Sequence, residues 1–214
     1  WEEPEGWPSH ATAAALLDQT GVIRVDNLTQ MFHTAGVLAH QPLPSGSRVA
    51  VVTNSWGPAW LAVDALKANG LAPTDPIDLS NGAEPEDFRV ALDALYDAGD
   101  VDAVLVIYAP GVSTHYQRVG AAIRAAGANP RAITTVAYML GQHGPSPLID
   151  GDIRIPQFPF PEEAAAALGR VAEYAAWRAG TGSPLVPGEE TTDSVRTRIT
   201  AALDECFEAL APGE

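Results

Sequence analysis

Arg48-Val49-Ala50-Val51-Val52-Thr53 is followed at once by Asn54-Ser55-Trp56-Gly57-Pro58, and this stretch decides the fold. A short β-branched run bounded by turn residues is typical of a strand that is buried in a parallel sheet. The residues after Pro58 favour a helix that ends at Gly70. A strand, a tight turn and a helix in this order form the repeating unit of α/β proteins.

The same unit recurs along the chain. Further strands are predicted near Pro76–Leu79 and over Val101–Tyr108, Ile133–Leu140 and Asp152–Ile155. Helices are predicted over Glu86–Ala98 and Thr114–Ala126, and from Pro161 to about Ala179. Five strands alternating with helices predict a doubly wound α/β domain with a five-stranded parallel sheet. We expect the flavodoxin-like strand order 2-1-3-4-5.

Flanking segments complete the predicted organisation. Residues 1–44 are predicted to form a connecting segment with two helices. The first covers Ala11–Gln19, and the second is capped by Asp26 or Asn27 and runs to about His40. Residues 45–180 form the flavodoxin-like domain, and residues 181–214 form a linker with an appended helix over Thr192–Leu210. Because the first residue is Trp1, we expect the chain to be a piece of a longer protein.

The charge balance is strongly acidic, with 27 Asp and Glu against 12 Lys and Arg and a formal net charge of −15. Binding to nucleic acid depends on basic surface, so this charge argues against a nucleic-acid partner. Cys206 is the only cysteine, which excludes an intrachain disulfide. No run of about 18 apolar residues could span a membrane, and the acidic start is unlike a signal peptide. We therefore expect a cytoplasmic protein without a membrane partner.

Three loops are candidates for a binding site, because ligands of open parallel sheets bind at the carboxyl ends of the strands. The candidate residues are Asn54, Ser55, Trp56 and Gly57 after the first strand, Asn81 and Gly82 after the second, and Gly111 after the third. Small residues let backbone amides approach an anion, and the amino end of a helix favours negative charge. The same residues also serve tight turns in any doubly wound protein, so a purely structural role stays open.

Other chemistry-bearing motifs are missing from the sequence. Neither the dinucleotide fingerprint G-x-G-x-x-G nor the P-loop motif occurs. The five histidines lack the spacing of a zinc site, and no serine has the G-x-S-x-G context of a nucleophile elbow. The sequence therefore predicts no catalytic residue, no metal site and no cofactor bound by this domain alone.

Six stretches along the chain occur in an order known from one enzyme family. They are Ala14–Asp26, Arg48–Asn54, Pro76–Leu79, Ala83–Phe88, Val101–Ile107 and Pro161–Arg178. Together they resemble the third, flavodoxin-like domain of the NDP-forming acyl-CoA synthetases, relatives of succinyl-CoA synthetase. The resemblance covers nearly the whole chain.

In that family, acyl-CoA formation is coupled to ATP or GTP through a phosphohistidine that swings between sites. The resemblance implies CoA-binding and ATP-grasp domains as partners, on the same or another chain, and CoA and Mg·ATP as cofactors of the full protein. It also implies that Asn54, Gly57, Asn81 and Gly82 help to hold the phosphohistidine. The chain departs from the family at Trp56, where a small residue, usually glycine, is expected. It also has no phosphohistidine motif.

Two interpretations stay open. The chain is either a ligase-type domain that forms one wall of the phosphohistidine and nucleotide site, inactive alone, or a non-catalytic regulatory or interaction module of an acyltransferase fusion. The second is suggested by similar degenerate modules that are fused to GNAT acetyltransferase domains. If the ancestral site is occluded, we expect Trp56 to cover the helix amino end and pack on the loops near Gly82 or Gly111.

Overall fold

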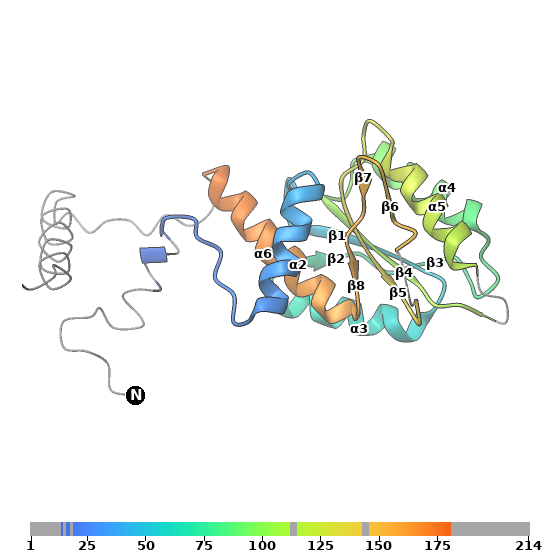
Figure 1. Cartoon of the computed structure of the whole chain (residues 1–214), viewed down its shortest axis with the longest axis horizontal. Helices are drawn as coiled ribbons and strands as arrows, with labels where there is room; N and C mark the ends of the chain where they lie inside the picture. Colours follow the sequence, from blue (N-terminus) through green and yellow to red (C-terminus); the bar gives the residue numbers. More distant parts are fainter. Residues whose placement is uncertain (1–13, 15, 18, 112–114, 143–145, 181–214) are drawn as a thin grey trace, which may run out of the picture. The chain divides into compact units, whose positions relative to one another are not determined.

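A parallel sheet with helices on both faces makes up most of the described chain, which comprises residues 14, 16–17, 19–111, 115–142 and 146–180 of the computed structural model (Figure 1). Its elements are α2 (Leu28–His40), β1 (Arg48–Thr53), α3 (Trp56–Ala68), β2 (Ala72–Pro73), β3 (Ile77–Asp78), α4 (Pro85–Ala98), β4 (Ala103–Tyr108), α5 (Tyr116–Gly127), β5 (Thr134–Met139), β6 (Ile149–Asp150), β7 (Ile153–Arg154), β8 (Gln157–Phe158) and α6 (Pro161–Arg178).

The strand order is β2-β1-β4-β5-β8, with β3 also paired to β1, and all of these pairs are parallel. If β2 and β3 are counted together as the second strand, then β4, β5 and β8 are the third, fourth and fifth. The order is then the expected 2-1-3-4-5. Apart from Arg48, every residue of β1, β4 and β5 is buried, as expected for central strands covered on both faces. The predicted doubly wound, flavodoxin-like fold is confirmed.

The second strand is interrupted by proline. The sequence predicts one strand near Pro76–Leu79, whereas the structure has β2 against the start of β1 and β3 against its end. The amides of Ala72 and Thr74 donate to β1, so the next donor would be residue 76. Pro76 has no backbone N–H to donate there, and it breaks this edge strand into two short pieces.

The predicted fifth strand over Asp152–Ile155 is wrong. Its residues Ile153 and Arg154 form β7, which pairs antiparallel with β6 in a separate two-stranded sheet. The turn between them contains Gly151, whose φ of 57° lies in the left-handed region that glycine adopts readily. The Gly151-Asp152 pair, which forms the two-residue loop between β6 and β7, is a hairpin signal that the sequence prediction overlooked. The fifth strand of the main sheet is β8.

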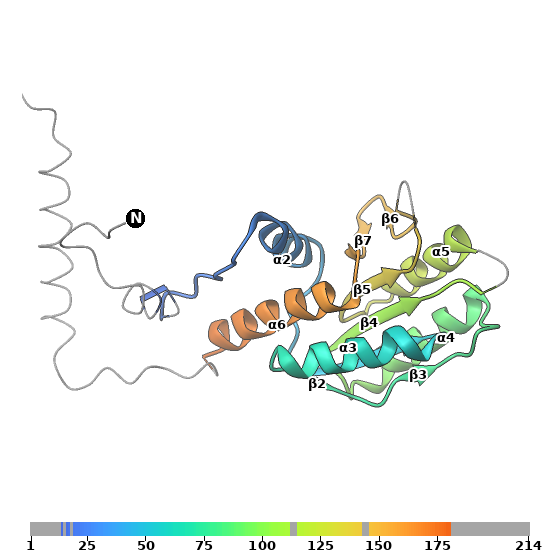
Figure 2. The ribbon, with the colours of Figure 1, turned by 90° about the horizontal axis from the view of Figure 1, so that it is seen from below.

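Side chains that alternate along each strand divide the core into two layers. Val51 of β1 faces α3 and α6, whereas its neighbour Val52 faces α4 and α5. Leu66 and Leu168 fill the first layer, and Phe88 and Ile123 fill the second. Figure 2 shows α3 and α6 side by side on one face of the sheet.

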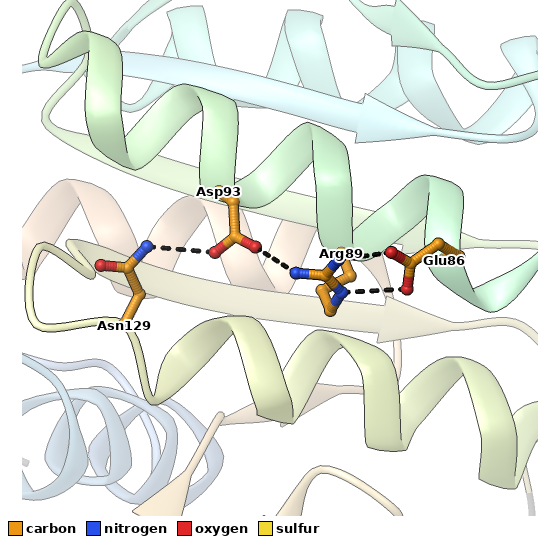
Figure 3. Close-up of polar contacts among 4 residues, drawn as sticks. All are labelled: Glu86, Arg89, Asp93 and Asn129. Carbon is orange, nitrogen blue, oxygen red and sulfur yellow. Dashed lines mark hydrogen bonds and ion pairs between the residues drawn. The ribbon is translucent and has the colours of Figure 1, made fainter.

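A polar network joins α4 to the end of α5 (Figure 3). The Arg89 guanidinium donates to Glu86 and, at 2.7 Å, to the Asp93 carboxylate. The other carboxylate oxygen of Asp93 accepts from Asn129 Nδ2 at 3.0 Å. Exposed ion pairs contribute about 1 kcal/mol at most, so this network orients α5 rather than carrying the stability of the domain.

The connecting segment packs on the domain through α2. Asn27 is the amino-terminal cap of this helix, because its Oδ1 accepts from the Gln30 amide at 2.9 Å. α2 lies against α6, where Arg170 Nη2 donates to Gln30 Oε1 at 2.8 Å.

Two other expectations concern the flanks. Residues 14, 16–17 and 19, within the helix predicted over Ala11–Gln19, are helical. The linker and helix predicted within residues 181–214 lie outside the described residues. The boundaries at residues 44 and 180 stay predictions.

Candidate functional site

The three predicted loops emerge at the carboxyl edge of the sheet. Residues 54–57 connect β1 to α3, residues 80–82 follow β3, and Gly111 lies three residues after β4. Because β3 and β4 pair with opposite sides of β1, the loop after β1 lies between the other two. The structure therefore brings the predicted residues to one edge, while their binding role stays a prediction.

Asn54 joins the first loop to the third. Its side chain is buried, with 2% of its surface exposed, and it pairs with the backbone of Ala109. Nδ2 donates to the Ala109 carbonyl at 2.7 Å, and Oδ1 accepts from the Ala109 amide at 2.8 Å. Asn54 thus fixes the loop after β1 to the loop after β4. Both the nitrogen and the oxygen of its side-chain amide are hydrogen-bonded.

Ser55 begins α3 without capping it. Its backbone amide donates to Thr53 Oγ1 at 2.9 Å, and the Thr53 hydroxyl donates back to the Ser55 carbonyl at 2.9 Å. The Ser55 side chain makes no cap hydrogen bond to the helix. The amides of Trp56 and Gly57 in the first turn have no acceptor within the helix itself. They are suited to an anion, which the helix dipole also favours.

The second and third loops approach each other closely. A Cβ added to Gly111 would lie 3.3 Å from the Asn81 carbonyl oxygen, so a larger residue would press on the second loop. Gly82 and Gly57 face open space instead, with nothing within 4 Å of such a Cβ. The loop geometry thus requires a small residue at Gly111, while the glycine at position 57 leaves room above the helix end.

Trp56 has a stacking partner on its own helix. Its side chain is 49% exposed and stacks on Trp60, one turn along α3, with ring centroids 6.0 Å apart and planes at 22°. Residues four apart on a helix lie on the same face, which brings the two indoles together. Packing of Trp56 on the loops near Gly82 or Gly111 stays a prediction.

Sequence reasoning missed a group of tyrosines at the same edge. Tyr108 ends β4 and packs edge-to-face on Tyr116, whose hydroxyl donates to the Leu140 carbonyl. Burial raises the pKa of Tyr116, and the Tyr108 charge adds to this effect. Burial also raises the pKa of Tyr138 near the end of β5, with a further contribution from Glu162. The hydroxyls of Tyr116 and Tyr138 therefore stay protonated at neutral pH. In the sequence, only the positions of these tyrosines near strand ends could have pointed to them.

A pocket of about 650 Å³ lies beyond this edge, beside β5 and β8. Exposed apolar side chains of Leu140, Ile149 and Phe160 contribute to its lining, together with the polar Arg154 and Gln142. None of its lining residues is among the predicted site residues. Residues 143–145, which follow the pocket residue Gln142 in the sequence, lie outside the described residues.

No group of three or more His, Cys, Asp or Glu side chains in the described part of the chain is placed to hold a metal ion. Likewise, no helix within the described ranges combines the length and apolar character needed to cross a bilayer.

Comparison with known proteins gives relatives of one kind. A 4-hydroxybutyrate–CoA ligase (ADP-forming) of Nitrosopumilus maritimus is 24% identical over 184 residues, which cover 76% of this chain and 26% of that protein. The alpha subunit of acetate–CoA ligase (ADP-forming) I of Pyrococcus furiosus is 24% identical over 189 residues, covering 78% of this chain and 41% of the subunit. The chain thus spans between a quarter and two fifths of these relatives. No protein-family model matches it.

Solved structures agree with this relationship at the level of the fold. The dinucleotide-forming acetyl-coenzyme A synthetase 1 of Candidatus Korarchaeum cryptofilum, in its apo form, aligns with a TM-score of 0.72 at 22% identity, covering 84% of this chain and 44% of that one. The same enzyme in complex with phosphate and ADP aligns with a TM-score of 0.70 at 23% identity, over 85% of this chain and 44% of that one. The chain is therefore homologous to one part of the ADP-forming acyl-CoA synthetases, the family that its sequence resembles.

Proposed function

We propose that this chain is a ligase-type domain of an ADP-forming acyl-CoA synthetase and forms one wall of its phosphohistidine and nucleotide site within a larger protein. The observation that carries the proposal is the uncapped amino end of α3, which opens at the carboxyl edge of the sheet. The Trp56 and Gly57 amides and the helix dipole together favour a phosphoryl group at this position.

The surrounding residues take supporting roles in this proposal. Asn54 holds the loop after β4 through its two hydrogen bonds to Ala109, so the edge is fixed before a ligand arrives. Gly57 leaves open space in which an anion can approach the helix end. Asn81, Gly82 and Gly111 form the adjoining rim, where the second and third loops touch.

The remaining chemistry is assigned to other parts of the intact protein. CoA-binding and ATP-grasp domains, on the same or a partner chain, would bring CoA and Mg·ATP to the reaction. The chain by itself is then inactive, because it brings neither a phosphohistidine motif nor a nucleotide-binding motif. A cytoplasmic location, where CoA and ATP are plentiful, belongs to the same proposal.

The alternative is a degenerate, non-catalytic regulatory or interaction module, for example one attached to a GNAT acetyltransferase domain. One observation favours it. Trp56 and Trp60 present two half-exposed indoles beside the helix end, at 49% and 52% exposure. Paired exposed tryptophans are typical of surfaces that bind proteins rather than phosphate.

Titration of the full chain with inorganic phosphate, phosphoimidazole and Mg·ADP tests the proposal. We expect amide resonances of Trp56 and Gly57 to shift first and to saturate in the millimolar range. Gly57→Ala should weaken this binding several-fold, because the added methyl group occupies the open space above the helix end. The same change should raise stability by up to about 1 kcal/mol, since alanine favours a helix over glycine.

Gly36→Ala is the matched control, because Gly36 also lies in a helix with open space around it but is far along the chain from this edge. It should stabilise the protein without changing the titration. The ligase proposal would be overturned if the titration shifted no amide resonances of α3 in the parent chain but did shift them in Trp56→Gly. That result would support the degenerate module.

A further inference from the structure

One helix exposes an apolar face without a single charged residue. The α2 outer face consists of Leu28, Met31, Phe32, Ala35, Gly36 and Ala39, spaced to lie on one side of the helix. Leu28, Met31 and Phe32 are 68%, 41% and 67% exposed. The opposite side of α2 packs on the domain, where Val37 is fully buried in the core and Gln30 and His33 contact Arg170 and Glu163 of α6. Contiguous exposed apolar side chains on the remaining side mark an interaction surface.

α4 has an outer face of ordinary polarity. Glu86, Arg89, Asp93 and Asp97 lie on its solvent side and form ion pairs with one another or with Arg131 in the loop after α5. α3 also exposes the apolar side chains of Trp56, Trp60 and Leu61, but the charged residues Asp64 and Lys67 are exposed on the same helix. α2 has no Asp, Glu, Lys or Arg between Leu28 and His40, in a chain with a formal net charge of −15. A partner recognised by charge would find nothing complementary here, whereas a second copy presents an equally neutral face.

The shape of the face also fits a second copy. Its large side chains lie in the amino-terminal half of α2, and its small residues lie in the carboxyl-terminal half. Two antiparallel copies would place Leu28 against Ala39, Met31 against Gly36 and Phe32 against Ala35, all related by one two-fold axis. A Cβ added to Gly36 would meet nothing within 4 Å, so a partner side chain has room there.

We propose that two copies of this chain associate through antiparallel packing of their α2 outer faces. Each large side chain of one copy fills the space above a small residue of the other, as a two-fold interface requires. The interface leaves the carboxyl edge of the sheet untouched, so it does not depend on the proposed ligase function. The equal net charges of the two copies oppose association, and added salt screens this repulsion.

Sedimentation of the full chain between about 5 and 500 µM tests the proposal. We expect the weight-average mass to rise from monomer toward dimer, and the dimer to strengthen at least several-fold between low and high salt. Phe32→Lys and Ala35→Glu should each abolish the dimer. Both positions are exposed, so both variants should keep the parent's circular dichroism.

Mixing the two variants gives the sharper result. In an antiparallel pair the new lysine of one chain faces the new glutamate of the other, so the mixture should recover a heterodimer that neither variant forms alone. Val90→Lys is the matched control, since Val90 is an exposed apolar residue at 53% exposure on α4, and it should leave the dimer unchanged. A parent chain that stays monomeric at all concentrations, or a mixture that stays monomeric, would overturn the proposal.

Discussion

Asn54 and Ala109 are joined by a two-point hydrogen bond, in which the asparagine side chain pairs with the Ala109 amide and carbonyl at 2.8 and 2.7 Å. Asn54→Asp keeps the shape of the side chain but removes the Nδ2 donor and buries a carboxylate beside a carbonyl. We expect a loss of about 2–3 kcal/mol in unfolding free energy, because a buried acceptor loses its partner. Chemical denaturation measures this loss. Asn27→Asp is the control, since it keeps the exposed acceptor for the Gln30 amide at the amino end of α2 and should not lower stability.

Trp56 should be less important for stability than a core aromatic residue. Trp56→Ala removes a ring that is half exposed, whereas Phe88→Ala empties a site with no exposed surface, where losses of about 3–5 kcal/mol are usual. A double-mutant cycle between Trp56 and Trp60 should give a coupling of about 0.5–1 kcal/mol, because the rings stack. A coupling of zero would contradict the stacked geometry.

Stability should fall at alkaline pH because of Tyr96. Burial raises the pKa of this phenol to about 12, although a hydrogen bond to Thr135 opposes the shift. The folded pKa lies above the unfolded value of about 10. The contribution of the neutral phenol is therefore complete below pH ~10 and is lost as the pH rises toward ~12. Urea unfolding between pH 8 and 12 should show this slope, and Tyr96→Phe should reduce it, leaving the smaller part from Tyr116 and Tyr138.

Stability should also fall at acid pH because of Asp102. Burial acts to raise the pKa of this carboxyl, but hydrogen bonds from Arg48 and Ser45 outweigh it and leave the pKa lowered. A lowered folded pKa gives stability that is present above pH ~4 and is lost as the pH falls further. Asp102→Asn should flatten this acid limb and cost about 1–3 kcal/mol at neutral pH. An unchanged pH profile would show that the Arg48 ion pair does not form in solution.

Gly169 should tolerate no side chain. A Cβ at this position of α6 would lie 2.7 Å from the Asn69 carbonyl oxygen, so α6 would have to move away from the end of α3. We expect Gly169→Ala to lower the thermal midpoint, even though alanine is the better helix former. Gly57→Ala, with open space around it, should have the opposite sign in the same assay.

The local sequence pattern was sufficient to predict a segment's structure where a single structural requirement explained all of its residues. The β-branched run from Val49 to Thr53 could only be a buried strand, and Asn27 was one of two candidates for the cap of α2. The sequence order of the loops also placed Asn54, Asn81 and Gly111 at one sheet edge, since parallel strands share their direction. The strand predicted at Asp152–Ile155 is wrong because a local turn signal, Gly151-Asp152, forms a hairpin where a strand of the main sheet was expected.

The sequence by itself determined the fold class, the strand order and the loops in which a site could lie, because hydrophobic periodicity and turn residues act locally. Tertiary structure alone decided which partner each side chain found. It paired Asn54 with Ala109, 55 residues away, and stacked Trp56 on Trp60. It also left Leu28 and Phe32 uncovered on α2. These outcomes depend on the packing of distant elements, which local patterns do not encode.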